Sequence, residues 1–321
     1  MVTLGAETAM RSLVLVEAPT NLGLRAPAQG REPGVRYMAE SMRARNLSER
    51  LRAKRVERLM PPPYSPEADW ETGYLNGQSL RAFASAQAKR LRSVLARGDF
   101  PVVVGGDCSL LLGDLLALKG LGRYGLVFID GHDDYSPPRD PAKYAGRFAA
   151  AGRDLALATG ADPSPLADID GAGPYVAEDD VVVFGAYRDP DDAADFDMDL
   201  IDSRPIFQMG IERLRECGAR AAAELARSFL EGRGLDGYWI HVDVDVLDRS
   251  VMPSVDSPNP KGLRFEELVA ALRVFLGSPL ASGIELCIYD PELDPEGLFG
   301  DQLADVIVAS FSGMKWRAAV W

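Results

Sequence analysis

The sequence is poor in cysteine and lacks long apolar runs. Its three cysteines, Cys108, Cys217 and Cys287, are an odd number without paired spacing in a chain of 321 residues. This pattern argues against a disulfide framework and predicts a reducing compartment. No apolar run approaches the ~18 residues of a membrane span, and Met1 to Arg11 lacks the apolar segment of a signal peptide. The chain is therefore expected to be soluble and cytoplasmic.

Basic residues are also fewer than acidic residues. Lys plus Arg number 35 against 48 for Asp plus Glu, which gives a net charge of -13. Such a surface would repel nucleic acid and anionic membranes, so neither is expected as a partner. The remaining composition, 47% hydrophobic and 26% charged without a low-complexity tract, is that of a globular protein. It does not shift along the chain, and we expect one domain over residues 1–321.

Short β-branched runs alternate with stretches that have helical spacing. This alternation predicts a parallel sheet covered by helices on both faces. The expected strands are Leu13 to Val16, Val102 to Val104, Leu126 to Ile129, Val181 to Phe184, Tyr238 to Val244 and Ile284 to Tyr289. The expected helices are Pro33 to Arg55, Asn76 to Arg97, Gly210 to Glu231 and Phe265 to Leu276.

The residues that follow these strands carry the chemistry, because such sheets bind ligands outside the carboxyl ends of their strands. Gly-Gly-Asp-Cys-Ser, Asp-Gly-His-Asp-Asp and His-Val-Asp-Val-Asp stand at three expected strand ends. They contain Cys108, Asp130, His132, Asp134, His241, Asp243 and Asp245.

A gathering of four of these carboxylates at one sheet edge requires compensation. Without cations, repulsion and desolvation would cost on the order of several kcal/mol. Divalent metal would remove this cost, and an oxygen-rich ligand set with a single imidazole suits Mn, Mg or Fe(II). The alternative is that each Asp is only a turn or helix-cap residue. Two spaced motifs after a Gly-Gly turn favour metal binding.

These motifs resemble those of the ureohydrolases, the family of arginase, agmatinase and formiminoglutamase. Gly105 to Ser109 resembles Gly-Gly-Asp-His-Ser, Asp130 to Asp134 resembles Asp-Ala-His-x-Asp, and Asp243 to Asp248 resembles Asp-x-Asp-x-x-Asp. The resemblance covers most of the chain. It implies a three-layer α/β/α fold with a central, mostly parallel sheet. It also implies a hydrolase with two divalent ions, usually Mn(II), whose bridging hydroxide attacks a C–N bond of a small guanidino, hydroxyguanidino or formimino compound. A homo-oligomer is expected.

The resemblance also implies the metal ligands. The first ion would be held by Cys108, Asp130, Asp134 and Asp243, and the second by Asp130, His132, Asp243 and Asp245. Most members have His where Cys108 stands, and a softer thiolate would allow Zn, Co or Fe(II) at this position. This variant resembles a branch that includes hydroxyarginine amidinohydrolase. The alternative is that Cys108 is a small buried hydrophobic residue.

Two departures bear on the substrate. A loop His of the family falls on Ala151, and the Glu that holds a guanidinium falls on Ile288. Hydroxyguanidino or formimino compounds are therefore expected rather than arginine. Glu285 could replace the missing Glu only if its strand bulged. The alternative function is that of a divergent metal-binding or regulatory protein that has lost turnover.

Several further side chains are candidates for the chemistry. His241 shares a strand face with Asp243 and is expected to assist proton transfer at the leaving group, as is Asp134. The alternative for His241 is a buried neutral ring bonded to a backbone carbonyl. The candidate substrate contacts are Ser136, Asp154, Asp191 and Glu285, of which Asp191 could equally be solvated.

Overall fold

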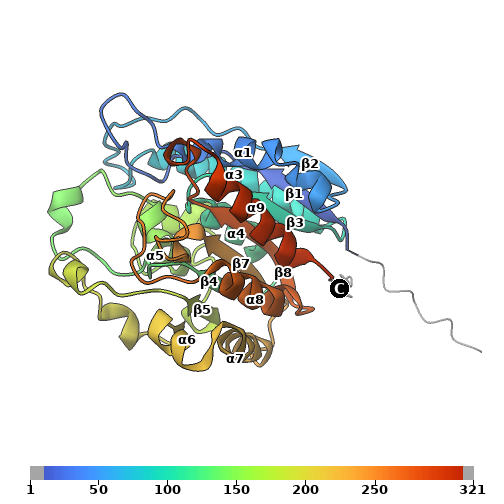
Figure 1. The fold of residues 1–321 in the computed structure, drawn as a ribbon. Helices are drawn as coiled ribbons and strands as arrows, with labels where there is room; N and C mark the ends of the chain where they lie inside the picture. Colours follow the sequence, from blue (N-terminus) through green and yellow to red (C-terminus); the bar gives the residue numbers. More distant parts are fainter. Residues whose placement is uncertain (1–10, 314–321) are drawn as a thin grey trace, which may run out of the picture.

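Eight parallel strands form one central sheet in the computed structural model, which describes residues 11–313 (Figure 1). The strand order is β2-β1-β3-β8-β7-β4-β5-β6, and every neighbouring pair is parallel. The expected parallel sheet is thereby confirmed. The strands are β1 (Leu13–Glu17), β2 (Arg55–Arg58), β3 (Phe100–Val104), β4 (Tyr124–Ile129), β5 (Val181–Phe184), β6 (Phe207–Met209), β7 (Gly237–Asp243) and β8 (Ala281–Cys287).

Helices cover both faces of this sheet, as Figure 1 shows. One hydrophobic core packs α1, α2 and α6 to α9 against the sheet, and the second packs α3 to α5 against the other face. Within the described range, no helix is both long and apolar enough to cross a membrane. The helices are α1 (Met38–Ala44), α2 (Leu47–Arg50), α3 (Gly77–Leu95), α4 (Leu110–Lys119), α5 (Asp154–Thr159), α6 (Ile211–Cys217), α7 (Ala219–Glu231), α8 (Phe265–Leu276) and α9 (Leu298–Phe311).

The expected elements differ from the observed ones where local signals are weak. The expected helix from Gly210 is broken at Gly218, which has φ 82°, and the one from Pro33 is broken at Asn46, which has φ 54°. Strands β2 and β6 were not expected, because these edge strands are short and only partly buried. Helix α4 was missed because its residues are buried almost throughout and show no apolar stripe.

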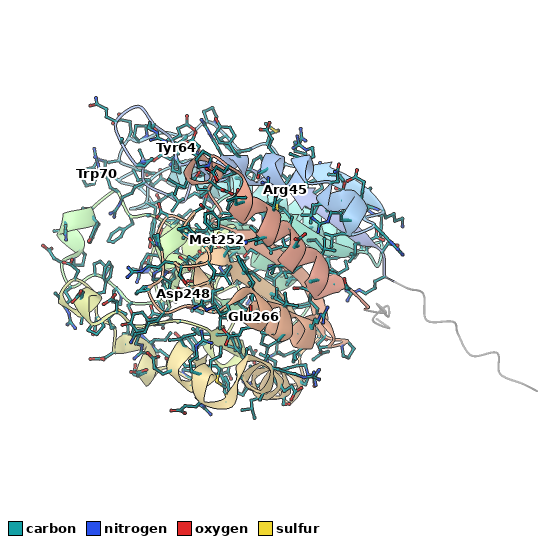
Figure 2. The ribbon with its side chains drawn as sticks, viewed as in Figure 1. Arg45, Tyr64, Trp70, Asp248, Met252 and Glu266 are labelled. Carbon is teal, nitrogen blue, oxygen red and sulfur yellow. The ribbon has the colours of Figure 1, made fainter. Side chains whose placement is uncertain are left out.

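Long loops collect at the carboxyl ends of the strands. Figure 2 labels Tyr64 and Trp70 in the loop between β2 and α3, and Asp248 and Met252 in the segment after β7. The Trp70 side chain is 76% exposed, whereas Met252 is fully buried. These loops surround the sheet edge that carries the predicted ligands.

A Gly-Gly turn after β3 fixes the start of this edge. A Cβ atom on Gly106 would lie 1.7 Å from the carbonyl oxygen of Thr20, so only glycine fits. The carbonyl oxygen of Gly106 also accepts a hydrogen bond from the amide of Ile288, at 2.7 Å, just after β8. The turn therefore ties β3 to the loop after β1 and to the end of β8, and Cys108 follows directly.

Candidate metal centre

The predicted ligands, and one cysteine that was not predicted, come from neighbouring strands in the middle of the sheet. Asp130 directly follows β4, Asp243 is the last residue of β7, and Cys287 is the last residue of β8. Strand β7 lies between β4 and β8, and Asp243 pairs in register with Cys287. Cys108 follows β3, the next strand beyond β8. Parallel pairing thus brings side chains that are far apart in sequence to one edge.

Two compact groups of possible metal ligands share Asp130. Cys108, Asp130 and Asp243 form one group, and Asp130, His132 and Asp245 form the other, with ligand atoms within 4.8 Å of one another. In the first group, Cys108 Sγ donates to Asp243 Oδ2 at 2.8 Å. In the second, His132 Nδ1 lies 3.1 Å from Asp245 Oδ2 and 3.6 Å from Asp130 Oδ1. Compared with the two expected ligand sets, the first group lacks Asp134 and the second lacks Asp243. The assignment of these residues as ligands stays a prediction.

Asp134 belongs to neither compact group of the described residues. It lines the cavity above the centre together with Asp243 and Asp245, and its backbone adopts a left-handed φ of 43°. A non-glycine residue in this region is uncommon, although Asp tolerates it better than most. Its role as a ligand stays a prediction.

Buried negative charge dominates the electrostatics of the centre. Burial and the neighbouring Asp245 and Asp130 hold the pKa of Asp243 well above its usual range. Burial and repulsion from Asp130 act on the pKa of Asp134 in the same direction. Burial also opposes ionisation of Asp130, yet attraction to His132 and His241 outweighs it and lowers the pKa of Asp130 to about 2. The protein alone therefore supplies too little positive charge for all these carboxylates.

The donor set fits a divalent cation. Asp130 Oδ2 is fully buried and has no hydrogen-bond partner among the described residues. Such an oxygen costs free energy unless a cation or donor reaches it. Carboxylate oxygens, one imidazole and one thiolate are all ligands that first-row divalent metals accept. The residues present are thus chemically suited to the metals that the sequence predicts.

His241 lies beneath this centre and contacts a second acid. Its Nδ1 hydrogen-bonds Glu285 Oε1, its register partner on β8, and its ring stacks on Phe128 with centroids 4.6 Å apart. His241 and Glu285 are both fully buried and do not line the cavity. The partner of the ring is therefore a carboxylate rather than a backbone carbonyl. Proton transfer from His241 to the leaving group stays a prediction.

A cavity of about 350 Å³ opens over the carboxylates. His132, Asp134, Asp243 and Asp245 form its polar floor. Apolar side chains form much of the remaining wall, and they include Leu24, Ala151, Phe196, Met198 and Ile288. The two positions where the family carries its loop His and its guanidinium-binding Glu therefore both face this cavity.

The expected substrate contacts are divided between the cavity and its surroundings. Ser136 lines the cavity, and its hydroxyl donates to Asp133 Oδ2 at 2.9 Å. Asp154 is fully buried, and Asp191 is exposed in the short 3₁₀ helix Pro190–Ala194. Asp256, which is not among the residues expected from the sequence, lies in the segment after β7 and lines the cavity. No motif marks this residue, and only the path of the loop brings it to the site.

Ile288 is held in a strained conformation at the cavity wall. Its φ is 74°, a region that a β-branched residue rarely adopts. The hydrogen bond from its amide to Gly106 and its nearly complete burial hold it there. This strain directs an apolar side chain to the wall of the site.

Comparisons with known proteins find relatives in sequence and in fold. The model of a family described as "Arginase family" matches residues 12–312. The arginase of Bacillus caldovelox is 27% identical over 292 residues, which cover 89% of this chain and 93% of that protein. Its solved structure has a TM-score of 0.81 at 22% identity, covering 95% of this chain and 99% of that one. The formimidoylglutamase of Bacillus subtilis has a TM-score of 0.69 at 16% identity, covering 97% and 89%. These structures share the fold.

Asp154→Asn should stabilise the metal-free protein at neutral pH. Neither carboxylate oxygen of Asp154 has a hydrogen-bond partner among the residues described, and burial with repulsion from Asp134 raises the pKa of Asp154 well above 3.8. The folded protein holds the Asp154 proton more tightly than the unfolded chain does. The stability from this difference is fully present below the ordinary pKa of 3.8 and is lost as the pH rises towards the raised pKa of the folded protein. Asparagine keeps the shape without the charge. We expect a gain of about 1 to 3 kcal/mol at pH 7 that shrinks towards pH 4.

Denaturant unfolding in the presence of a chelator measures this difference. Asp305→Asn, at an exposed position on α9, is the control and should change stability little at either pH. Equal stability of Asp154→Asn and the wild type at pH 7 would contradict an unpaired buried acid at this position.

Proposed function

The chain belongs to the arginase family, and we propose that it is a metal-dependent hydrolase of a small guanidino, hydroxyguanidino or formimino compound. The observation that carries this proposal is the pair of ligand groups that share Asp130 below one cavity. A substrate held in that cavity would present its amidine carbon to the polar floor. Localisation in the cytoplasm and assembly into a homo-oligomer stay predictions.

The ligand groups indicate where two ions would bind. Cys108, Asp130 and Asp243 would hold one ion and Asp130, His132 and Asp245 the other, with Mn(II) expected from the family and Zn, Co or Fe(II) from the thiol. Bound ions of this kind supply Lewis acidity and a water of lowered pKa for attack on carbon.

The side chains around the ions prepare the site for this chemistry. Attraction to Asp245 is the largest cause that raises the pKa of His132, so the pair keeps the imidazole oriented towards Asp245 until an ion replaces its proton. Asp134 lies in the cavity, where burial raises its pKa. Its carboxyl group can therefore hold a proton and donate it to the departing amine.

The cavity wall favours an uncharged head group. Ile288 and Ala151 present no charge to the substrate. Two acids outside the expected ligands line the cavity: Asp256, whose pKa is raised by burial, and Asp133, whose Oδ2 already accepts from Ser136. A guanidinium ion that entered would therefore lose its hydration, and the wall would offer little negative charge to offset that loss. An N-hydroxylated guanidine has a lower pKa than a guanidine and can enter in neutral form. This supports such substrates over arginine and agmatine.

Metal analysis tests the centre. We expect two ions per chain after dialysis against Mn(II), and we expect Asp130→Ala to lose both because Asp130 belongs to both groups. Asp305→Ala, remote on α9, should keep both. Elemental analysis by mass spectrometry gives the stoichiometry. Trace metal in the wild type, or full occupancy in Asp130→Ala, would refute the proposed centre.

Ile288→Glu should move specificity towards arginine. A carboxylate at this wall position would pair with a guanidinium, and we expect kcat/KM for arginine to rise about tenfold, or about 1.4 kcal/mol in transition-state binding. Ile288→Gln is the matched control, since it has the same shape without the charge. Steady-state assays on arginine, agmatine, hydroxyarginine and formiminoglutamate provide the measurement.

The same assays rank the substrates of the wild type. Hydroxyarginine or formiminoglutamate should have the highest kcat/KM. Highest values for arginine or agmatine would overturn the substrate assignment. If the protein with full metal occupancy turns over no compound in a broad amidine panel, the result would instead support the alternative function, a metal-binding or regulatory family member that does not catalyse hydrolysis.

A further inference from the structure

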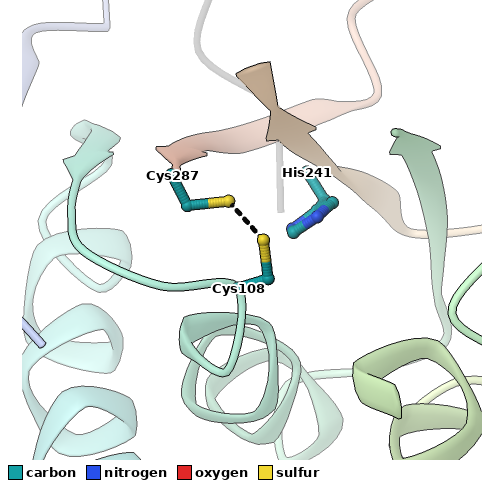
Figure 3. Close-up of side chains that lie close together, drawn as sticks. All are labelled: Cys108, His241 and Cys287. Carbon is teal, nitrogen blue, oxygen red and sulfur yellow. Dashed lines mark hydrogen bonds between the residues drawn. The ribbon is translucent and has the colours of Figure 1, made fainter. Parts of the chain in front are cut away.

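Cys287 places a second thiol at the metal centre. It ends β8 beside Asp243, and its Sγ lies 2.8 Å from Cys108 Sγ. Figure 3 shows the two sulfur atoms pointing towards each other with the His241 ring beside them. One ligand atom from each of Cys108, His241 and Cys287 lies within 4.8 Å of the others, and all three side chains are fully buried. These residues form a buried cluster, and none of them lines the cavity.

Two buried polar atoms at this cluster lack hydrogen-bond partners in the described part of the chain. His241 Nε2 has no hydrogen-bond partner among the described residues, and neither has Asp130 Oδ2. The two atoms lie 3.8 Å apart, and Asp154 Oδ2 lies at the same distance from Nε2. Unpaired buried donors and acceptors are rare and cost free energy. A cation between the ring nitrogen and the carboxylate would satisfy both.

The other ring nitrogen is already oriented in the way that metal-binding histidines require. His241 Nδ1 hydrogen-bonds the buried Glu285 carboxylate, which fixes the ring plane and leaves Nε2 free to bind a metal. Histidine ligands in proteins usually donate their second N–H to such an acid. The stacked Phe128 ring further limits rotation of the imidazole.

The spacing of the donors suits a small tetrahedral ion. With metal–sulfur bonds of about 2.3 Å and metal–nitrogen or –oxygen bonds of about 2.0 to 2.2 Å, tetrahedral ligand atoms lie roughly 3.3 to 3.8 Å apart. The Nε2–Oδ2 distance of 3.8 Å lies at the upper end of this range, and the sulfur atoms at 2.8 Å would need to separate. Two thiolates, an imidazole and a carboxylate select Zn(II) over Mn(II).

We propose that Cys108, Cys287, His241 and Asp130 bind one Zn(II) ion on the deep side of the metal centre. Cys287 and His241 thereby take the places expected for Asp134 and Asp243 at this ion. Asp243, an expected ligand of both ions, stays with His132 and Asp245 at the harder, oxygen-rich position. The inference rests on the proposed function, because Cys108 and Asp130 also belong to the metal centre proposed there. It concerns the donors and the identity of one ion rather than the substrate.

Cobalt(II) reports the thiolates directly. Metal-free, reduced full-length protein is titrated with Co(II) under anaerobic conditions, and the intensity of the sulfur-to-cobalt charge-transfer band measures the number of Co–S bonds. The wild type should give the intensity of two thiolates, and Cys287→Ser and Cys108→Ser about half of it. Cys217→Ser is the matched control, because Cys217 is exposed at the end of α6, and its spectrum should equal that of the wild type.

Zinc and manganese binding by the same variants test the selectivity. Cys287→Ser should lower the ratio of Zn(II) to Mn(II) affinity at least tenfold while Mn(II) still binds. Asp134→Ala should keep the wild-type cobalt spectrum. A Cys287→Ser spectrum equal to the wild type, or loss of the charge-transfer band in Asp134→Ala alone, would overturn the assignment.

X-ray absorption at the zinc edge decides the case without any variant. The wild type with one equivalent of Zn(II) should show two sulfur neighbours at about 2.3 Å. One sulfur neighbour of zinc or none would contradict the proposal, as would a Cys108–Cys287 disulfide that survives treatment with a reductant. If zinc has two sulfur neighbours but the protein shows no hydrolase activity, only the proposed function is refuted. If the protein binds Mn(II) and turns over substrate but zinc has no sulfur neighbour, only this inference is refuted.

Discussion

Buried negative charge at the carboxyl edge of the central sheet is the constraint on which the site depends. Asp130, Asp243 and Asp245 are almost completely withdrawn from water, and they meet because β4 and β7 pair in parallel. Burial and repulsion among them raise the pKa of Asp243 and favour its protonation, while attraction to two imidazoles keeps Asp130 charged. Cations that enter this edge would replace those protons and relieve the repulsion, so the fold and the chemistry rely on the same compensation.

The surroundings of this charge fix the positions of the ligands. The Gly-Gly turn allows β3 to approach the loop after β1 and bonds to the amide of Ile288, and it thereby sets the location of Cys108. The His241–Glu285 pair supports the centre from below, and the strained Ile288 closes the wall above. Rigid elements thus hold both the ligands and the substrate wall, as precise binding geometry requires.

The sequence predicts most of the fold and most of the residues that gather at the sheet edge, and it fails where strand pairing or loop paths decide. Buried β-branched runs mark six strands, whereas the edge strands β2 and β6 are too short and polar to be recognised. Cys108, Asp130, His132, Asp243 and Asp245 lie in contiguous motifs directly after strands, so a local pattern suffices to find them. Cys287 and Glu285 approach the centre only through the register of β7 with β8, and Asp256 only through the course of its loop. No local spacing encodes these contacts.

Anomalous diffraction from metal-replete crystals tests the central claim most directly, namely that cations compensate the carboxylates at this sheet edge. Data at the manganese and zinc absorption edges locate each ion and identify it. We expect two anomalous peaks per chain, both within bonding distance of Asp130, with the zinc signal on the side of Cys108 and the manganese signal on the side of His132. Crystals grown with both metals that show no peak beside Asp130 and Asp243 would contradict the claim.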